Sequence, residues 1–358
     1  MGQRLNKISN FIKIKSTDDF IEISNKFSRQ VNIYSNNEIL IDYTSGSKEM
    51  IMAATVCAAF SNRTLIFVDF KRDENNSIII GKEEIKEQKL DELQDNIILG
   101  RIVENFNKYR YESVIEQIMN LSLVDNEDEK SEFTVLNFAL INETYNSWDK
   151  FNHKEALEYF KTGFYDFFPP LKKQLKMNYK ALKILNNVKD PLNDYYLLAS
   201  LVNNARRRYD EGKYDDGIAR LYRSMELISQ IELKKIGINP SDIDINKIKN
   251  ISEYTYEKFR SRIVMSSNGK YHTGGLDVNF MLIHHLKSFN EVGNFYYKNH
   301  DKIYEILQYR NESILAHGFK VQSEEDFNVF EELVLILAKK LDKNFELYLE
   351  ETKFPEFP

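Results

Sequence analysis

The sequence predicts an α+β protein, in which a small α/β sheet domain over residues 1–95 precedes a mostly α-helical region over residues 96–358. Two observations lead to this fold class. In the first part, short apolar segments alternate with helical patterns, which is typical of strand–helix units in a parallel sheet. In the second part, apolar positions recur with helical spacing, and the scarcity of Gly (13) and Pro (6) favours long helices.

The sheet domain is expected to start with a strand, a helix and a second strand. The first strand candidate is "FIKIK" (11–15), and the polar run at 16–19 supplies N-cap chemistry for a helix that reaches about Gln30. The second strand candidate is "EILIDYT" (38–44). Strands joined by a helix pair in parallel through a right-handed crossover.

A second helix and a third strand follow. Residues 45–61 form a turn and a helix that is apolar on nearly all sides, so this helix should be buried together with the single Cys57. "TLIFVDF" (64–70) is apolar throughout, as a central parallel strand is, and 76–81 is a candidate edge strand. Residues 82–95 turn polar and helical, and the domain boundary is placed there.

The remaining chain is expected to be helical to about residue 353, without further strands. Polar and Pro- or Gly-containing stretches predict the interruptions between helices. They lie at 124–132, 168–171, 238–245 and 265–277.

Composition excludes several classes of protein. The formal charge of −6 argues against a protein that coats duplex DNA, because such a protein carries a basic surplus. The six His residues stand in no metal-ligand spacing, so no metal is expected. No apolar run approaches the ~20 residues of a membrane span, and the first residues lack the apolar core of a secretory signal. These points favour the cytoplasm.

The stretch "DYTSGSKEM" (42–50) predicts a strand, a tight turn and the start of a helix. Small residues expose backbone N–H groups at the turn, the helix N-terminus adds partial positive charge, and a lysine adds a full charge. This chemistry suits a phosphate at the carboxyl edge of a sheet. The residues concerned are Asp42, Thr44, Ser45, Gly46, Ser47 and Lys48. An ordinary capped helix explains the same residues equally well, and the P-loop spacing is absent.

The stretch "RNESILAH" (310–317) places Arg310 and His317 about two helical turns apart, within roughly 20° on one face of a helix. Asn311 and Ser313 lie near that face, and Gly318 is expected to end the helix as its C′ residue. A histidine moves protons near neutral pH, and a guanidinium holds a phosphate. The pattern therefore fits half of an RNA-cleaving site, although a surface arginine and a helix-terminal histidine produce the same spacing.

A second polar pattern lies on the helix expected at 204–230. Arg220, Arg223, Glu226 and Gln230 recur at spacings of three and four, which places them in one stripe of an otherwise apolar helix. Such a stripe is commonly a solvated face. Near the Arg310 helix it would instead hold RNA phosphates, or orient Arg310 through Glu226.

Taken together, these stretches resemble the CARF–HEPN ribonucleases that accompany type III CRISPR systems. The turn at 42–50 is similar to the "D-x-T-G-G-T-K-x-M"-like turn of CARF sensor domains, and 310–318 is similar to the HEPN pattern R-x(4–6)-H. The stretch 206–230 looks like the helix hairpin that precedes this pattern in one branch of the family. The resemblance covers most of 37–70 and about 195–320.

The resemblance implies a partial Rossmann-like CARF domain over 1–95 and a HEPN ribonuclease domain with its core at about 195–350. It implies that a homodimer binds a cyclic oligoadenylate as allosteric activator at the 42–48 turn. It also implies metal-independent cleavage of single-stranded RNA by Arg310, Asn311 and His317, with 2′,3′-cyclic phosphate products. Arg220, Arg223, Glu226 and Ser313 would support the site or bind RNA. No other cofactor and no membrane are implied.

The sequence departs from the family in its sensor part. Only about 36 residues precede "EILIDYTSG", and the "TxG"-type loop after a first strand is missing, so the sheet is expected to lack roughly two strand–helix units. Two alternatives to a gated ribonuclease therefore stay open. One is a toxin-like ribonuclease that acts independently of a sensor, and the other is a catalytically silent module that binds nucleotide or RNA.

Overall fold

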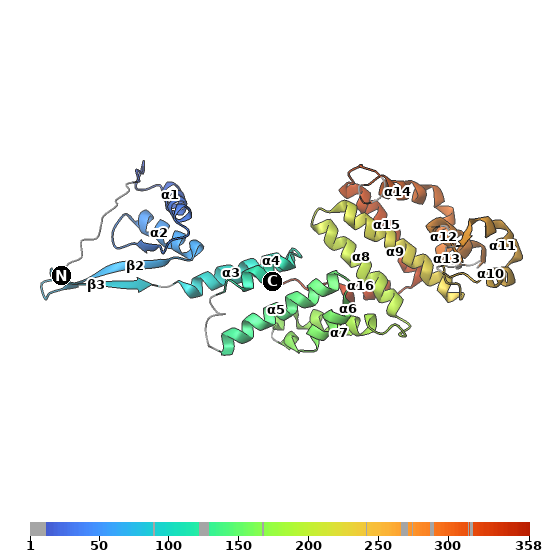
Figure 1. The fold of residues 1–358 in the computed structure, drawn as a ribbon, viewed down its shortest axis with the longest axis horizontal. Helices are drawn as coiled ribbons and strands as arrows, with labels where there is room; N and C mark the ends of the chain where they lie inside the picture. Colours follow the sequence, from blue (N-terminus) through green and yellow to red (C-terminus); the bar gives the residue numbers. More distant parts are fainter. Residues whose placement is uncertain are drawn as a thin grey trace. The chain divides into compact units, whose positions relative to one another are not determined.

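The computed structural model describes residues 12–88, 90–121, 129–166, 168–240, 242–265, 271–273, 275–286, 290–313, 315 and 318–358. The chain divides into two compact units. The first holds Met1–Glu104 and Glu112–Leu136, and the second holds Asn105–Tyr111 and Asn137–Pro358. The sheet of three strands belongs to the first unit and most helices belong to the second (Figure 1), so the predicted α+β class is confirmed.

The sheet of the first unit has the order β1 (Leu40–Asp42), β2 (Thr64–Arg72) and β3 (Ile78–Gln88). β1 and β2 run parallel, with Leu40 opposite Thr64, as the strand–helix–strand pattern predicts. β2 and β3 run antiparallel. The carboxyl end of β1 therefore leads directly into the turn that carries the phosphate-binding candidates.

Two helices pack on each other beside this sheet (Figure 1). α1 (Phe20–Ile33) begins after Asp19, whose carboxylate accepts from the Glu22 N–H, and α2 (Lys48–Ser61) begins after Ser47. The core of the unit includes Val31, Ile41, Ala54, Cys57, Ala58 and Leu65. The buried position of Cys57 agrees with the sequence prediction.

Two predicted elements of this unit are wrong. Residues 12–15 form no strand, because the backbone there bonds to side chains of α1: the Lys15 N–H donates to the Glu22 carboxylate at 3.1 Å. Residues 82–88 are strand and not helix, since they continue β3. Their alternating charges resemble a helical surface in sequence, yet they form cross-strand ion pairs, such as Lys86 with Asp69.

Helices α3 (Asp91–Asn107), α4 (Tyr111–Ile118) and α5 (Glu129–Asp149) follow the sheet. The second unit then continues with α6 (His153–Phe160), α7 (Lys172–Leu185), α8 (Asn193–Asp210) and α9 (Tyr214–Lys235). α8 and α9 form a helix hairpin, as the family resemblance implied for the stretch 206–230. The expectation of one helix over 204–230 is wrong, because the chain turns at 211–213. The apolar faces of α8 and α9 are buried, and this hairpin is the framework on which the later helices pack.

The last part of the chain folds around this hairpin. Its helices are α10 (Ile245–Ile251), α11 (Glu253–Phe259), α12 (Leu276–Leu286), α13 (Glu291–Lys298), α14 (His300–Glu312), α15 (Glu324–Leu341) and α16 (Phe345–Thr352). α12, α14 and α15 pack against α9, and α16 packs against α8. The expectation of no further strands is wrong, because β4 (Ile263–Met265) and β5 (Tyr271–Thr273) form a small antiparallel pair. In the described part of the chain, no helix is long and apolar enough to cross a membrane.

Candidate functional site

The Arg310 motif lies at the end of α14, a helix that packs against α9 and α15. α14 ends at Glu312, five residues before the predicted end, so the expectation of one helix through His317 is wrong. The chain instead turns back: the Gly318 N–H donates to the Ser313 carbonyl at 3.1 Å, and the Lys320 N–H donates to the Glu312 carbonyl at 2.9 Å. The Glu312 and Ser313 carbonyls are therefore already bonded and cannot accept from the N–H groups of a further helical turn.

Gly318 has a different role from the predicted one. Its φ is not in the left-handed region, so it is not a C′ residue of the Schellman type. A Cβ at this position would overlap the backbone carbonyl of Glu312. Glycine is therefore required by the close approach of the backbone at Gly318 to the end of α14 at Glu312.

The described members of the motif differ in exposure. Arg310 lies in the last turn of α14, Asn311 is half-buried, and Ser313 is buried, where its backbone forms a bridge to Lys320. Lys320 also pairs with the Glu312 carboxylate at 3.2 Å. His317 lies outside the described residues. The structure thus places Arg310, Asn311 and Ser313 close together in the chain at one helix end.

The polar stripe on α9 is present, and its members divide into two groups. The Arg223 guanidinium donates to the Glu226 carboxylate and to the Gln230 amide oxygen, each at 3.3 Å. Arg223 is exposed, so this group faces solvent. Arg220 instead pairs with Asp216 and donates to the Asn204 side chain on α8. Arg223 is therefore the more available of the two arginines for a phosphate.

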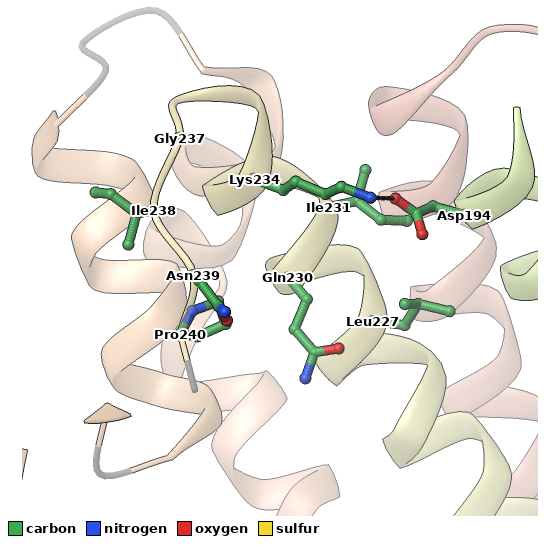
Figure 2. Close-up of a pocket in the computed structure, with 9 residues that line it drawn as sticks. All are labelled: Asp194, Leu227, Gln230, Ile231, Lys234, Gly237, Ile238, Asn239 and Pro240. Atoms are coloured by element: carbon green, nitrogen blue, oxygen red, sulfur yellow. Dashed lines mark hydrogen bonds and ion pairs between the residues drawn. The ribbon is translucent and has the colours of Figure 1, made fainter. Parts of the chain in front are cut away.

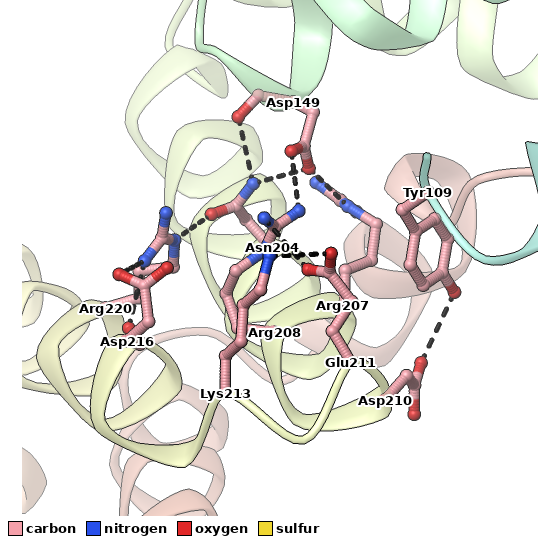
Figure 3. A network of polar contacts seen from close by, with 10 residues as sticks. All are labelled: Tyr109, Asp149, Asn204, Arg207, Arg208, Asp210, Glu211, Lys213, Asp216 and Arg220. Carbon is pink, nitrogen blue, oxygen red and sulfur yellow. Dashed lines mark hydrogen bonds and ion pairs between the residues drawn. The ribbon is translucent and has the colours of Figure 1, made fainter. Parts of the chain in front are cut away.

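A buried ionic network on α8 was missed by the sequence reasoning (Figure 3). Asp149, the last residue of α5, accepts from Arg207 Nε and Arg208 Nη2, each at 2.7 Å, and from the Asn204 amide at 2.8 Å. The Arg207 guanidinium also lies over the Phe354 ring at 3.7 Å. The available signal was the run of three arginines at 206–208 in an otherwise apolar helix.

The turn that follows β1 is held by its own side chains. The Asp42 carboxylate accepts from the Thr44 N–H at 2.8 Å, and the Thr44 hydroxyl accepts from the Val68 N–H at 2.8 Å. The Ser47 hydroxyl caps α2 through the Met50 N–H and donates to the Thr17 carbonyl at 2.8 Å. These three side chains therefore shape the turn.

The exposed groups of this turn are those that a ligand could reach. Ser45, Gly46 and Lys48 are exposed, and Gly46 has a φ of +136°, which only glycine adopts readily. Glu49 also lies in the first turn of α2, where hydrogen bonds from its own N–H and from Ser47 lower its pKa. A phosphate here would bind beside that carboxylate.

Several other titratable groups lie in the second unit. Burial lowers the pKa of His153 to about 4, and its Nε2 has no hydrogen-bond partner among the described residues. Burial, together with the Lys258 ammonium, lowers the pKa of His285. Within the described ranges, no group of three His, Cys, Asp or Glu residues is arranged to hold a metal ion.

Comparisons with known proteins cover both parts of the helical region. The family models described as "Csm6 HEPN domain" and "Csm6 6H domain" match residues 186–341 and 95–194. Among solved structures, the chain is similar to Enterococcus italicus Csm6 bound to cyclic hexa-2′-fluoro-hexa-dAMP. The identity is 14% and the TM-score is 0.50, over 96% of this chain and 80% of that chain, so this likeness concerns the fold. No curated protein matches the chain.

Proposed function

The chain belongs to the CARF–HEPN family of type III CRISPR effectors, and we propose that it is an endoribonuclease that cuts single-stranded RNA at the Arg310 motif. The observation that carries this proposal is the HEPN match over 186–341, which contains the whole of 310–317. The backbone bonds from Gly318 to Ser313 and from Lys320 to Glu312 support it, since they bring the chain that follows the motif back to the end of α14.

The proposed cleavage divides its chemistry between three residues. His317 moves a proton between the 2′-hydroxyl, which attacks the adjacent phosphorus, and the departing 5′-oxygen. Arg310 stabilises the charge that develops on the phosphate oxygens, and Asn311 orients either group. Attack by the 2′-hydroxyl leaves a 2′,3′-cyclic phosphate and a free 5′-hydroxyl. These steps need no metal ion, because the side chains supply both the proton transfer and the positive charge.

The supporting residues take unequal roles in this proposal. Arg223 is exposed and is held by Glu226 and Gln230, so it is suited to a phosphate of the bound strand. Arg220 is engaged with Asp216 and Asn204, which suits it to positioning the α8–α9 hairpin. The buried Ser313 maintains the turn through its backbone.

We further propose that two copies of the chain complete the site. Three apolar side chains beside the motif are exposed: Leu315 (53%), Phe319 (90%) and Val321 (83%). Exposed apolar groups gathered on one short segment are typical of an association surface, and a two-fold interface would bring two Arg310 motifs together.

A cyclic oligoadenylate is the proposed activator, bound at the turn between β1 and α2. Support comes from the similar fold of the E. italicus protein, which was solved with a cyclic hexanucleotide analogue, and from the exposed Lys48 and Gly46. Because Asp42, Thr44 and Ser47 shape the turn, its phosphate contacts would come from Lys48, Ser45 and backbone N–H groups. The boundary at residue 95 is proposed to separate this sensor from the effector part. The protein is proposed to act in the cytoplasm.

The test is an RNA cleavage assay in EDTA, with and without cyclic tetra- and hexa-adenylate. Wild type is expected to cut labelled single-stranded RNA to 2′,3′-cyclic phosphate ends, whereas the Arg310→Ala/His317→Ala variant leaves it intact. Arg260→Ala/His272→Ala removes the same residue types elsewhere in the second unit and should retain cleavage.

The outcomes separate the proposed functions. Stimulation by one ring size supports a gated enzyme, and equal cleavage without a cyclic nucleotide supports a ribonuclease that acts independently of a sensor. Cleavage by the Arg310→Ala/His317→Ala variant at the rate of wild type would refute the catalytic assignment. RNA or nucleotide binding without cleavage under any condition would favour the silent binding module.

A further inference from the structure

A pocket of about 430 Å³ lies between the C-terminal half of α9 and the chain segment that follows it (Figure 2). This volume lies in the range of small-molecule sites, about 300–1,000 Å³. The pocket belongs wholly to the second unit. It is lined by Asp194, Leu227, Gln230, Ile231, Lys234, Gly237, Ile238, Asn239 and Pro240.

The walls of the pocket combine apolar surface with a few polar groups. Leu227, Ile231, Ile238 and Pro240 contribute the apolar part. At one end, the Lys234 ammonium pairs with the Asp194 carboxylate, so this lysine is already neutralised by a neighbour. A ligand with flat apolar faces and a polar edge fits these walls better than a phosphate does.

The amide of Gln230 has a fixed direction. Its oxygen accepts from both terminal nitrogens of Arg223, each at 3.3 Å. A guanidinium has no acceptor, so the amide NH₂ cannot take the place of that oxygen. Among the described residues nothing accepts from this NH₂, and Figure 2 shows the side chain extending between α9 and the segment of Asn239 and Pro240. The Gln230 amide NH₂ is thus available as a hydrogen-bond donor to a ligand in the pocket.

The pocket continues the polar stripe of α9. Arg223, Glu226, Gln230 and Lys234 follow one another at spacings of three, four and four, which keeps them on one side of the helix. Arg223 is the residue proposed above to bind an RNA phosphate. A strand that contacts Arg223 therefore meets Gln230 and the pocket within the next few residues along the helix, at about 1.5 Å per residue.

We propose that this pocket binds one base of the single-stranded RNA, and that Gln230 donates a hydrogen bond to an acceptor on that base. This proposal rests on the proposed function in taking RNA as the ligand. A base presents flat apolar faces to the walls and a polar edge to the amide. Uracil offers O4 as acceptor where cytosine carries an amino group, so the proposal places this position of the base at Gln230, where the amide NH₂ would favour uracil over cytosine.

The experiment measures RNA binding by the full chain, carrying Arg310→Ala/His317→Ala to prevent cleavage. Fluorescently labelled oligouridylate and oligocytidylate of equal length are the probes, and anisotropy gives the two dissociation constants. Gln230→Glu keeps an acceptor for Arg223, but the carboxylate has no N–H to donate to the base in the pocket. The affinity for oligouridylate, relative to that for oligocytidylate, should therefore fall about fivefold, or about 1 kcal/mol. The added negative charge weakens the binding of both oligonucleotides, so its effect cancels in the ratio of the two dissociation constants.

Two further variants make the result specific. Gln230→Met has a similar length and no hydrogen-bonding group, so it should move the ratio in the same direction by a smaller factor. Gln30→Met replaces a glutamine of similar partial exposure on α1 and should leave the ratio unchanged. Because Gln230 is partly exposed, its variants are expected to fold, which the Trp148 fluorescence of each protein verifies.

Failure of the pocket and failure of the enzyme are distinguishable. If wild type cleaves RNA but the ratio is the same in all four binding proteins, the pocket proposal is wrong and the proposed function stands. If the ratio shifts as expected but wild type does not cleave, the pocket stands and the catalytic assignment is wrong. If neither homopolymer binds, the pocket proposal is overturned as well.

Discussion

Replacement of Asp149 by asparagine is expected to destabilise the second unit strongly. The Asp149 carboxylate is mostly buried and serves two guanidinium groups, Arg207 and Arg208, at 2.7 Å each. The asparagine side chain would have nearly the same shape but no negative charge. Arg208 would keep its ion pair with Glu211 at 2.9 Å, whereas Arg207 would remain buried without an anionic partner in the described structure.

The expected loss follows from the burial of this pair. Removal of one partner from a buried ion pair costs about 3–5 kcal/mol, because the remaining charge stays out of water. The asparagine side chain still accepts one hydrogen bond, which places the expected cost for Asp149→Asn at the lower end, about 3 kcal/mol. Asp166→Asn is the matched control, since Asp166 pairs with Lys172 on the surface and should cost under about 1 kcal/mol.

Trp148 makes the measurement specific, since it is the single Trp of the chain, is fully buried and precedes Asp149 directly. Urea titrations followed by its fluorescence therefore report unfolding around the network, and the midpoint shift gives the difference in free energy of unfolding. If Asp149→Asn and Asp166→Asn lower the free energy of unfolding by the same small amount, the buried network contributes no more than a surface ion pair and the reasoning is refuted.

Three further perturbations have defined outcomes. Because burial lowers the pKa of His153 to about 4, the unfolded chain, with a histidine pKa near 6.5, binds the proton first as pH falls. The free energy of unfolding of wild type should therefore fall by about 2 kcal/mol between about pH 7.5 and 5, and that of His153→Phe should not show this fall. Urea midpoints that change equally with pH in the two proteins would contradict this. Gly318→Ala forces the backbone at position 318 away from the Glu312 carbonyl and should reduce RNA cleavage about tenfold or more, whereas Gly100→Ala, with open space around it, should not. Phe319→Ser should shift sedimentation toward the monomer if this 90% exposed ring lies in the dimer interface, and an unchanged profile would exclude it.

The elements that the sequence predicted well are those whose signals are local. Asp19 is an N-cap because its carboxylate reaches the Glu22 N–H three residues ahead, and the polar run at 16–19 is visible in the sequence itself. β2 follows from an uninterrupted apolar run, whereas the α8–α9 hairpin was indicated by the family resemblance and not by periodicity. The candidate site residues at 310–317 were found by pattern and resemblance, and their roles remain predictions.

The errors arose where a local pattern had two structural solutions. The charges of 82–88 fit a solvated helix as well as a strand, and pairing with β2 selected the strand. The apolar run at 12–15 has strand character, but the described residues have no strand beside it, and side chains of α1 took its backbone groups. Likewise, α14 stopped at Glu312 because partners further along the chain, the N–H groups of Gly318 and Lys320, replaced the next helical turn.

The sequence by itself determined the α+β class, the order of the long helices and the family resemblance, because periodicity, caps and motif spacing are properties of neighbouring residues. The tertiary structure decided which polar residues meet. Asp149 and Arg207 are 58 positions apart, and only the packing of the end of α5 against α8 brings their charges together in a buried network. The pocket beside Gln230 exists for the same reason: its walls come from separate segments, and no sequence spacing records the distance between them.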